Sequence, residues 1–263
     1  MNLELDGKTA LITGASVGIG LAIAEGLAAE GVNLVLVARN KERLDQEAAR
    51  IADYYKIKTL GIAVNIASAS DVKETVRLVE ERFGGIDILI NNAGTGSNET
   101  IAEATDEKWQ LYWELHVMAA VRLARGFMPT MKRRGGGVIL HNASICAAQP
   151  LWYEPIYNVT KAALMMFSKV LAHEAIDHNI RVNTVNPGLV LTPDWIKTAK
   201  ELTEKSGGDW QAYLNGVAEE HAPIKRFASP KEIADFFVFL CSARASYSSG
   251  SAYYVDGGML KTV

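Results

Sequence analysis

Three side chains within one stretch could together move a proton at an oxygen atom. Tyr157 and Lys161 begin a run whose apolar residues, such as Leu164 and Leu171, recur with helical spacing. On a helix, side chains four positions apart share one face, so the phenol and the ammonium would lie one turn apart. A free tyrosine has a pKa near ~10, and a neighbouring cation favours the phenolate. A phenol tuned in this way can act as a general acid or base at an alcohol or a carbonyl.

Ser144 closes the apolar run 138–140 and could place a hydroxyl beside that phenol. The spacing itself is weak evidence, because Tyr54 and Lys58 repeat it without a serine at the matching upstream position. We expect that second pair to lie on the surface, in water. The case for Tyr157 therefore depends on the elements that surround it.

Short apolar runs alternate with helical patterns along the whole chain. The predicted strands are 9–13, 33–37, 59–64, 86–90, 138–141, 181–185 and 252–255. The predicted helices are 19–30, 41–55, 71–83, 106–132, 156–177 and 230–241. Strands separated by helices predict right-handed β-α-β units and a parallel sheet that is buried on both faces. No internal repeat or proline-rich linker interrupts the pattern, so we expect one α/β domain over residues 1–263.

Residues 189–226 depart from this alternation. The segment is long, holds Trp195 and Trp210, and contains a glycine pair at 207–208. A long insertion after a strand end in such a fold most often covers a substrate site. We therefore expect a lid or substrate loop within the domain.

The bulk composition argues against several classes of function. A net charge of -3 gives no reason to expect nucleic acid or an anionic membrane as a partner. No apolar run approaches the length that crosses a membrane, and the start Met1–Glu4 does not resemble a secretory signal. The two cysteines, Cys146 and Cys241, suggest no disulfide framework and fit a reducing compartment. We expect a cytoplasmic protein without a metal site.

The segment 13–20, Thr-Gly-Ala-Ser-Val-Gly-Ile-Gly, falls where the first predicted strand turns into the first predicted helix. Glycines there permit a tight turn, a close approach of the backbone to a pyrophosphate, and close helix–strand packing. The helix N-terminus would offer free N–H groups and a positive dipole end to the phosphates. The spacing is not the usual G-x-G-x-x-G, but the position after the first strand indicates a nucleotide-binding turn.

Five motifs occur in a fixed order: TGxxxGxG at 13–20, Asn-Asn-Ala-Gly at 91–94, Ser144, YxxxK at 157–161 and Asn-Pro-Gly at 186–188. In this combination the chain resembles the short-chain dehydrogenase/reductase family, from about Gly7 to about Gly258. The first glycine spacing points to the single-domain branch of that family. The resemblance implies a doubly wound, Rossmann-type sheet of seven parallel strands with helices on both faces. It also implies hydride transfer between a nicotinamide cofactor and a carbonyl–alcohol pair.

The resemblance further implies roles for individual residues. Tyr157 would be the general acid/base, Lys161 would hold the nicotinamide ribose and lower the pKa of the phenol, and Ser144 would hydrogen-bond the substrate oxygen. The cofactor would contact the glycine turn, the strand ends and the segment after the sixth strand, at Gly14, Ser16, Gly18, Ile19, Gly20, Arg39, Asn65, Ile66, Asn92, Ala93, Gly94, Tyr157, Lys161, Pro187, Gly188, Val190 and Thr192.

The residues after the second predicted strand favour NADP(H) over NAD(H). Ala38 stands where NAD-dependent relatives usually carry an aspartate, and Arg39 follows it. An arginine near the ribose 2′ position suits a phosphate, whereas an acid does not. We therefore expect NADP(H) as the cofactor.

Two positions depart from the family pattern. Asn65 replaces an aspartate at the adenine ring, and because an amide still accepts and donates, we expect adenine binding to be kept. His116 replaces an asparagine that supports a water leading to the catalytic lysine. It is either a packed core histidine on the helix 106–132 or a catalytic participant that takes the asparagine's place in a proton relay.

The substrate pocket would be walled by Ser144, Cys146, Gln149, Trp152, Tyr157 and Trp195. With little charge there, we expect a ketone reductase or alcohol dehydrogenase for a small to medium substrate that is apolar or cyclic. The alternative is a 3-oxoacyl-thioester reductase serving an acyl carrier protein, although the insertion and the acidic balance count against it. A third hypothesis, a non-catalytic nucleotide-binding sensor, would be expected to lack the tyrosine or the lysine. By analogy alone we expect a homotetramer or homodimer.

Overall fold

The computed structural model describes residues 1–96, 98–151, 153–204 and 207–262. Its strands are β1 (Thr9–Thr13), β2 (Asn33–Ala38), β3 (Thr59–Ala63), β4 (Ile88–Asn91), β5 (Gly137–Asn142), β6 (Ile180–Pro187) and β7 (Ala252–Val255). Its α-helices are α1 (Gly18–Ala29), α2 (Lys41–Tyr55), α3 (Ala69–Phe83), α4 (Asp106–Trp113), α5 (Ala119–Arg133), α6 (Pro155–Ala175), α7 (Pro193–Glu204), α8 (Trp210–His221) and α9 (Pro230–Cys241).

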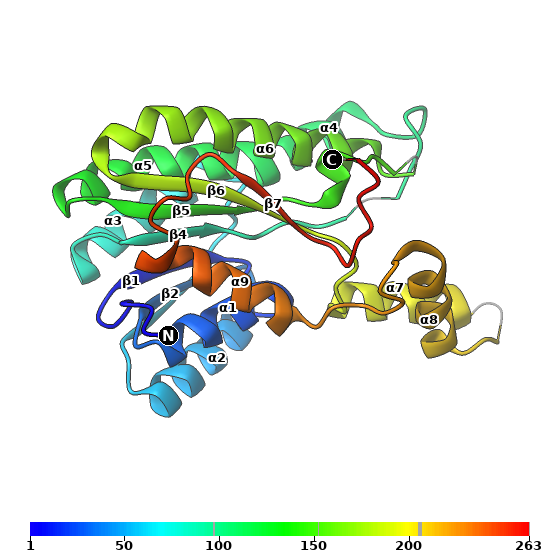
Figure 1. The fold of residues 1–263 in the computed structure, drawn as a ribbon, viewed down its shortest axis with the longest axis horizontal. Helices are drawn as coiled ribbons and strands as arrows, with labels where there is room; N and C mark the ends of the chain where they lie inside the picture. The colour runs from blue at the N-terminus through cyan, green and yellow to red at the C-terminus, as the bar shows by residue number, and fades with distance from the viewer. Residues whose placement is uncertain (97, 152, 205–206, 263) are drawn as a thin grey trace.

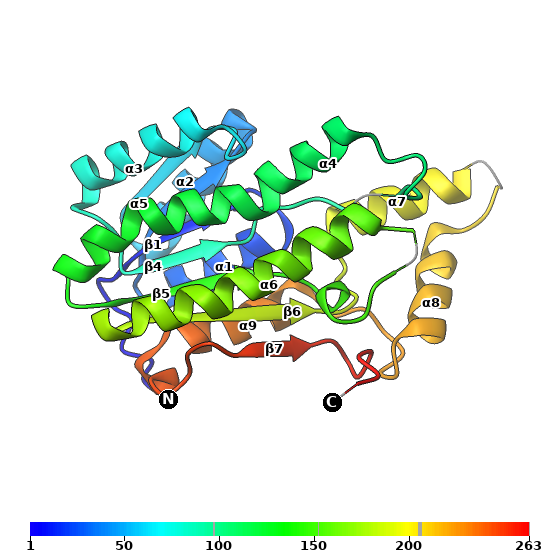
Figure 2. The same cartoon turned by 90° about the horizontal axis from the view of Figure 1, so that it is seen from above.

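The strands form one parallel, seven-stranded sheet, as predicted, and their order in it is β3-β2-β1-β4-β5-β6-β7. Helices α1, α2 and α9 cover one face, whereas α3, α5 and α6 cover the other (Figure 1, Figure 2). The direction of the chain along the sheet reverses between β1 and β4. In a doubly wound sheet, ligands bind outside the carboxyl ends of the strands at this reversal.

Burial on both faces explains why the strands are apolar throughout. Every residue of β1 and of β6 is buried. Successive side chains point to opposite faces, so Ala10 and Ile12 join the core beneath α1 and α9, whereas Leu11 joins the core beneath α3 and α5. The sheet is therefore held from both sides, and its carboxyl edge is a fixed platform.

Short polar side chains begin several of the helices close to the predicted positions. In each case the side chain accepts a hydrogen bond from a backbone N–H of the first turn, which would otherwise lack a partner. The capping residues are Asn40, Ser68, Thr105, Asp209 and Ser229. The helices after Asn40, Ser68, Thr105 and Ser229 start within two residues of the predicted positions, whereas α8, after Asp209, was not predicted.

The predicted fourth strand begins later than expected, at Ile88 rather than Ile86. The intervening Asp87 uses its carboxylate to accept the backbone N–H of Thr9 over 2.8 Å and to pair with Arg134 over 2.8 Å. These contacts lie at the amino edge of the sheet, so they anchor the strand but do not lengthen it.

The predicted helix 106–132 is interrupted, so the expectation of one regular helix is wrong in its middle. α4 ends at Trp113, a π-helical turn occupies Glu114–Met118, and α5 follows directly. A π turn holds an extra residue, which hydrophobic periodicity does not reveal, and such turns often lie at functional sites. The buried His116 lies inside this turn.

The insertion 189–226 contains two helices, α7 and α8, which pack against each other. Their buried residues include Ala199 and Leu214. Figure 1 shows the pair projecting from the carboxyl edge of the sheet, beyond the end of β6. A parallel bridge between Val190 and Ala228 fastens the two ends of the insertion together. Its role as a lid stays a prediction.

No helix within the described ranges is both long and apolar enough to cross a membrane.

Candidate active site

Ser144 and Tyr157 meet at the carboxyl edge of the sheet. Ser144 follows β5 in an extended conformation, and its Oγ accepts the N–H of Cys146 over 3.1 Å. α6 begins at Pro155, which places Tyr157 in its first turn. The phenol and the serine hydroxyl are hydrogen-bonded to each other. Because Ser144 is buried and Tyr157 is partly exposed, both hydroxyls can meet the oxygen of a substrate that enters from the edge.

Lys161 completes the predicted trio one helical turn later. Its side chain is buried, and its Nζ donates to the carbonyl oxygen of Asn142, at the end of β5, over 2.8 Å. The same Nζ lies 5.3 Å from the centre of the Tyr157 ring. Burial lowers the pKa of Lys161 from 10.5 to about 8, so the ammonium is still protonated at neutral pH.

Burial acts on the phenol as well. It raises the pKa of Tyr157 above the ordinary value, Cys146 adds to this shift, and the hydrogen bond with Ser144 opposes it. In this structure the effect of burial outweighs the lowering that we expected from Lys161. Tyr157 therefore keeps its proton at neutral pH, which is the state required of an acid that protonates a carbonyl oxygen.

The second tyrosine–lysine pair lies on the surface, as predicted. α2 ends at Tyr55, and Lys56 turns the chain out of the helix with a left-handed φ of 58°. Tyr54 is 76% exposed, and Lys58 is also exposed beyond the helix end. The pair therefore does not share one helix face, and equal spacing in the sequence gives different geometry.

Side-chain amides join the glycine turn to Lys161. Asn92 donates from Nδ2 to the carbonyl of Thr13 over 2.9 Å, and its backbone N–H donates to the Thr13 hydroxyl over 3.0 Å. Asn142 donates from Nδ2 to Oδ1 of Asn92 over 2.8 Å, while its own carbonyl accepts Lys161. One set of hydrogen bonds thus connects the ends of β1, β4 and β5 with α6. Asn92 was expected beside the ribose; its amide also has this structural task.

The turn 13–20 has the tight backbone conformation that its glycines permit. Gly14 and Gly18 have φ values of 68° and 58°, which favour glycine. A Cβ on Gly20 would stand 2.2 Å from the carbonyl oxygen of Gly14, so α1 begins directly against the turn. Ser16 is buried within the turn and Ile19 is partly buried.

α1 starts differently from the capped helices. No side chain of the described residues caps it, and its first turn holds no acidic residue. Its N–H groups and the positive end of its dipole therefore point to the carboxyl edge without a neutralising partner. These features fit the pyrophosphate of the expected nicotinamide cofactor.

The predicted cofactor residues after β2, β3 and β4 lie along the same edge. Arg39 follows β2 and is exposed. Asn65 is exposed after β3, where its Oδ1 accepts the N–H of Ala67 over 3.2 Å, and the adjacent Ile66 is buried. Beyond β4, Ala93 is partly buried and Gly94 is exposed.

The segment after β6 approaches the glycine turn from the other side. A Cβ on Gly18 would be 3.7 Å from the side chains of Thr192 and Pro193, so this segment passes over the start of α1. Pro187 ends β6 in a buried position. A Cβ on Gly188 would be 2.9 Å from the carbonyl oxygen of Asp256, which leaves no room for a side chain. Val190 is buried within the bridge that closes the insertion.

His116 is engaged through both ring nitrogens. Nδ1 is 2.8 Å from the hydroxyl of Thr160, which itself donates to the carbonyl of Ile156 over 2.8 Å, so Nδ1 carries the hydrogen. Nε2 accepts the N–H of Thr95 over 3.2 Å. Burial, and then the charge of Lys161, lowers the pKa of the imidazole to about 2. His116 is thus a neutral, satisfied imidazole.

The same ring also touches the catalytic region. It meets the Tyr157 ring edge-on, with centroids 5.7 Å apart. A Cβ on Gly94 would stand 3.1 Å from His116 Nε2 and 3.4 Å from Lys161 Nζ. His116 therefore packs as a core histidine directly behind the tyrosine and the lysine, and its part in a proton relay stays a prediction.

The predicted substrate residues lie in different environments. Cys146 is buried beside Ser144. Gln149 is bound to the C-terminal segment, because its Nε2 donates to the carbonyl of Met259 over 3.2 Å and its Oε1 accepts the N–H of Lys261 over 3.0 Å.

Trp195 packs edge-on against Phe227, with ring centroids 5.2 Å apart, at the base of the insertion. Trp152 lies outside the described residues.

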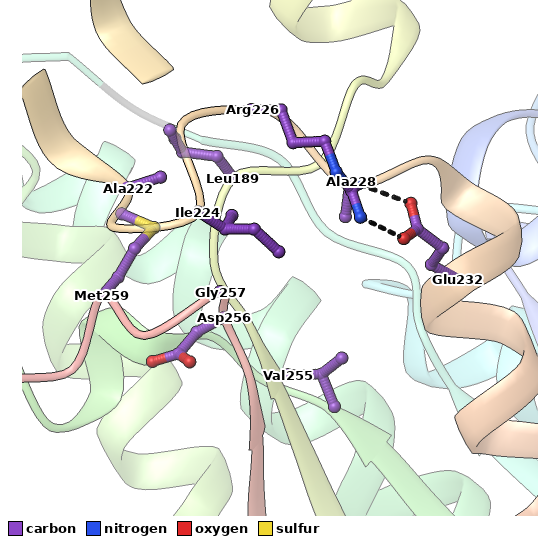
Figure 3. Close-up of a pocket in the computed structure, with 10 residues that line it drawn as sticks. All are labelled: Leu189, Ala222, Ile224, Arg226, Ala228, Glu232, Val255, Asp256, Gly257 and Met259. Carbon is purple, nitrogen blue, oxygen red and sulfur yellow. Dashed lines mark hydrogen bonds and ion pairs between the residues drawn. The ribbon is translucent and has the colours of Figure 1, made fainter. Parts of the chain in front are cut away.

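A cavity of about 150 Å³ lies at the base of the insertion (Figure 3). Its described lining includes Leu189, Ile224 and Met259, but none of the catalytic trio. Arg226 and Glu232 form a two-fold ion pair over 2.9 and 2.8 Å at its side. This cavity separates the C-terminal segment from the insertion and is not the predicted catalytic site.

One acidic residue of the site escaped the sequence reasoning. Glu154 directly precedes α6, three positions before Tyr157, and burial followed by the charge of Glu99 raises its pKa to about 7. A carboxyl group amid the apolar stretch 151–156 is the signal that could have identified it. Within the described ranges, no group of three metal-ligating side chains is placed to hold a metal ion.

Known proteins share this architecture. The family model described as enoyl-(acyl carrier protein) reductase matches residues 14–260. L-sorbose reductase from Gluconobacter frateurii, solved in complex with NADPH and L-sorbose, is 68% identical over 100% of both chains, with a TM-score of 0.99.

Curated relatives are more distant. Dehydrogenase/reductase SDR family member 4 from Sus scrofa is 34% identical over 97% of this chain and 88% of its own. The 3-oxoacyl-[acyl-carrier-protein] reductase FabG from Aquifex aeolicus is 31% identical over 98% of this chain and 100% of its own.

The first prediction concerns the trio. Tyr157→Phe removes the transferable proton but keeps the ring, so we expect cofactor binding to persist and kcat to fall by about 10²–10⁴-fold. Lys161→Ala should lower kcat and weaken cofactor binding together. Tyr54→Phe is the matched control and should change neither kcat nor cofactor binding. Steady-state kinetics and a cofactor titration measure these effects, and near-wild-type activity of Tyr157→Phe would contradict the mechanism.

The second prediction concerns His116. An amide can donate and accept, so His116→Asn should remain active, whereas His116→Leu should fold but lose most turnover. Full activity of the leucine variant would leave His116 with a packing role only. The measurement is turnover against pH for both variants and the wild type.

Thermal unfolding gives an independent readout of the same imidazole. It binds a proton near pH 6.5 in the unfolded chain but only near about 2 in the folded one, so the folded protein loses stability as pH falls below about 6.5. His116→Asn should therefore lose less stability than the wild type between about pH 7 and about pH 5. An identical loss in both proteins would show that the imidazole does not stay neutral.

Proposed function

This chain belongs to the short-chain dehydrogenase/reductase family, and we propose that it uses NADPH to reduce a ketose, with L-sorbose as the first candidate, to the corresponding polyol. The observation that carries the proposal is the 68% identity, over the full length of both chains, to a protein solved with NADPH and L-sorbose. The arrangement of Ser144, Tyr157 and Lys161 supports the ketone chemistry, and the uncapped start of α1 supports the dinucleotide.

When bound, NADPH supplies a hydride to the carbonyl carbon. The residues of the chain bind and protonate the carbonyl oxygen. The Ser144 hydroxyl donates a hydrogen bond to it, and Tyr157 transfers its phenolic proton as negative charge develops there. The Lys161 ammonium stabilises the phenolate that remains, and solvent then returns one proton to the tyrosine. A ketone, a hydride and a proton thus give a secondary alcohol.

From the sequence we expected an apolar or cyclic ketone. The identity to the sorbose reductase favours a polyhydroxylated one instead, because that protein was solved in complex with L-sorbose. Cytoplasmic location and assembly into a homodimer or homotetramer stay predictions.

A 3-oxoacyl-thioester reductase is the second candidate, favoured by full-length relatives named for that activity. The decisive experiment follows NADPH oxidation with L-sorbose and with an acetoacetyl thioester. We expect kcat/KM for L-sorbose to exceed that for the thioester by about tenfold or more. The reverse order would favour the acyl-carrier alternative, and cofactor binding without turnover of any carbonyl would favour the sensor.

Cofactor choice gives a separate prediction. Arg39 is proposed to pair with the 2′-phosphate through its planar fork, a charge-assisted contact worth roughly 1.5–3 kcal/mol. Arg39→Ala should raise the KM for NADPH by about tenfold or more, with little change for NADH. Arg43→Ala, which removes an exposed arginine from the next turn of chain, is the control. Equal effects of Arg39→Ala on both cofactors would contradict the assignment.

A further inference from the structure

Glu154 places a carboxylate at the start of the helix that carries Tyr157. It is half-buried and occupies the position just before α6, yet its side chain does not cap that helix. Instead it turns toward the loop after β4, because a Cβ on Gly96 would lie 3.4 Å from its Oε1. Among the described residues, nothing donates a hydrogen bond to this carboxylate.

Hydrogen bonds fix the loop that this carboxylate faces. Tyr112, from α4, donates its hydroxyl to the carbonyl of Gly96 over 2.6 Å, and α4 packs beside the start of α6 (Figure 2). The N–H of Glu99 donates to the carbonyl of Tyr153 over 3.1 Å. The loop after β4 is thus tied to α4 and to Tyr153, which directly precedes Glu154.

Several charged or titratable groups face Glu154. Glu99 is buried, with one carboxylate oxygen bound to Lys108 and the other, Oε1, without a partner in the described part of the chain. The remaining groups are those whose protonation Glu154 influences, namely Tyr112, Cys146, Tyr153 and Tyr157. Glu154 therefore lies within electrostatic reach of the atoms that would receive the reacting carbonyl.

When a ligand displaces the water at a half-buried carboxylate, binding is unfavourable unless the ligand supplies hydrogen bonds in its place. An apolar ketone held at Ser144 and Tyr157 would displace water from Glu154 without offering the carboxylate a hydrogen-bond donor. A ketone with neighbouring hydroxyl groups brings donors of the required kind. The chemistry at Glu154 thus distinguishes the two substrate classes.

We propose that Glu154 is the residue that selects polyhydroxylated ketones, by accepting hydrogen bonds from hydroxyl groups near the substrate carbonyl. This inference rests on the proposed reductase function and assigns its substrate preference to one side chain. It is a specificity role, because the proton still comes from Tyr157.

The preference should also depend on pH. Burial, and then the neighbouring Glu99, raises the pKa of Glu154 to about 7. The acceptor is therefore ionised only above about 7, and a protonated carboxyl group is a weaker acceptor. Preference for the hydroxylated ketone should increase as the pH rises through this range.

The experiment compares L-sorbose with 2-hexanone, a six-carbon 2-ketone without hydroxyl groups. Glu154→Gln should lower kcat/KM for L-sorbose by about 10–100-fold, and this loss should exceed the loss for 2-hexanone by about tenfold or more. Glu154→Asp, which keeps the charge, should retain more L-sorbose activity than Glu154→Gln. Glu174→Gln, an exposed position in the same helix, should change neither rate.

The same assays at about pH 6 and about pH 8 test the titration. The wild-type ratio of kcat/KM for L-sorbose to that for 2-hexanone should rise with pH, and the ratio for Glu154→Gln should be flat. Thermal unfolding checks the fold. Because a raised carboxyl pKa means that ionisation costs stability as pH rises toward and past about 7, Glu154→Gln should unfold no earlier than the wild type at about pH 8.

The outcomes separate the two proposals. If the wild type reduces L-sorbose but Glu154→Gln lowers kcat/KM equally for both ketones, or for neither, the selection role is wrong. The ketose reductase function then stands. If the wild type reduces 2-hexanone but no ketose, the proposed ketose function is wrong and the selection role falls with it.

Discussion

The buried ammonium of Lys161 is the constraint on which the site depends. A charge that is only 3% exposed needs a partner, since an unmet buried donor costs roughly 1–3 kcal/mol and a charged one more. The carbonyl of Asn142, at the end of β5, supplies that partner. This contact fixes the rotation of α6 against the sheet, and the rotation in turn brings Tyr157 to Ser144. The geometry of the proton-transfer groups therefore follows from satisfying one buried charge.

The constraint extends to the cofactor end of the molecule. Asn142 binds Asn92 through its side chain, and Asn92 binds Thr13, where the glycine turn begins. The glycine turn and Lys161 are thus parts of one hydrogen-bonded unit across three strand ends. A displacement at either end would strain these amide contacts, so the glycine turn and the start of α6 keep their relative positions.

The sequence predicted the elements whose signals are local. Apolar runs located the strands, helical periodicity located most of the helices, and the motif order located Ser144, Tyr157 and Lys161 in the fold. What it missed depends on contacts between distant segments. Asn142 matters because Asn92 and Lys161 reach it, Glu154 because the loop at Gly96 faces it, and neither partner is visible from spacing. The π turn around His116 and the two helices of the insertion likewise arise from packing that periodicity does not encode.

Two hydrogen bonds join the side chain of Gln149 to the backbone of Met259 and Lys261, and they limit where the protein can be tethered. Figure 2 shows the N-terminus on the side of the strands' amino ends and the C-terminal segment on the side of their carboxyl ends. An affinity tag, a fusion partner or a surface linker attached there would pull on a segment that is bonded to the residues just after Ser144. Attachment through the N-terminus, at the far edge, would leave the substrate entrance unencumbered during purification or immobilisation.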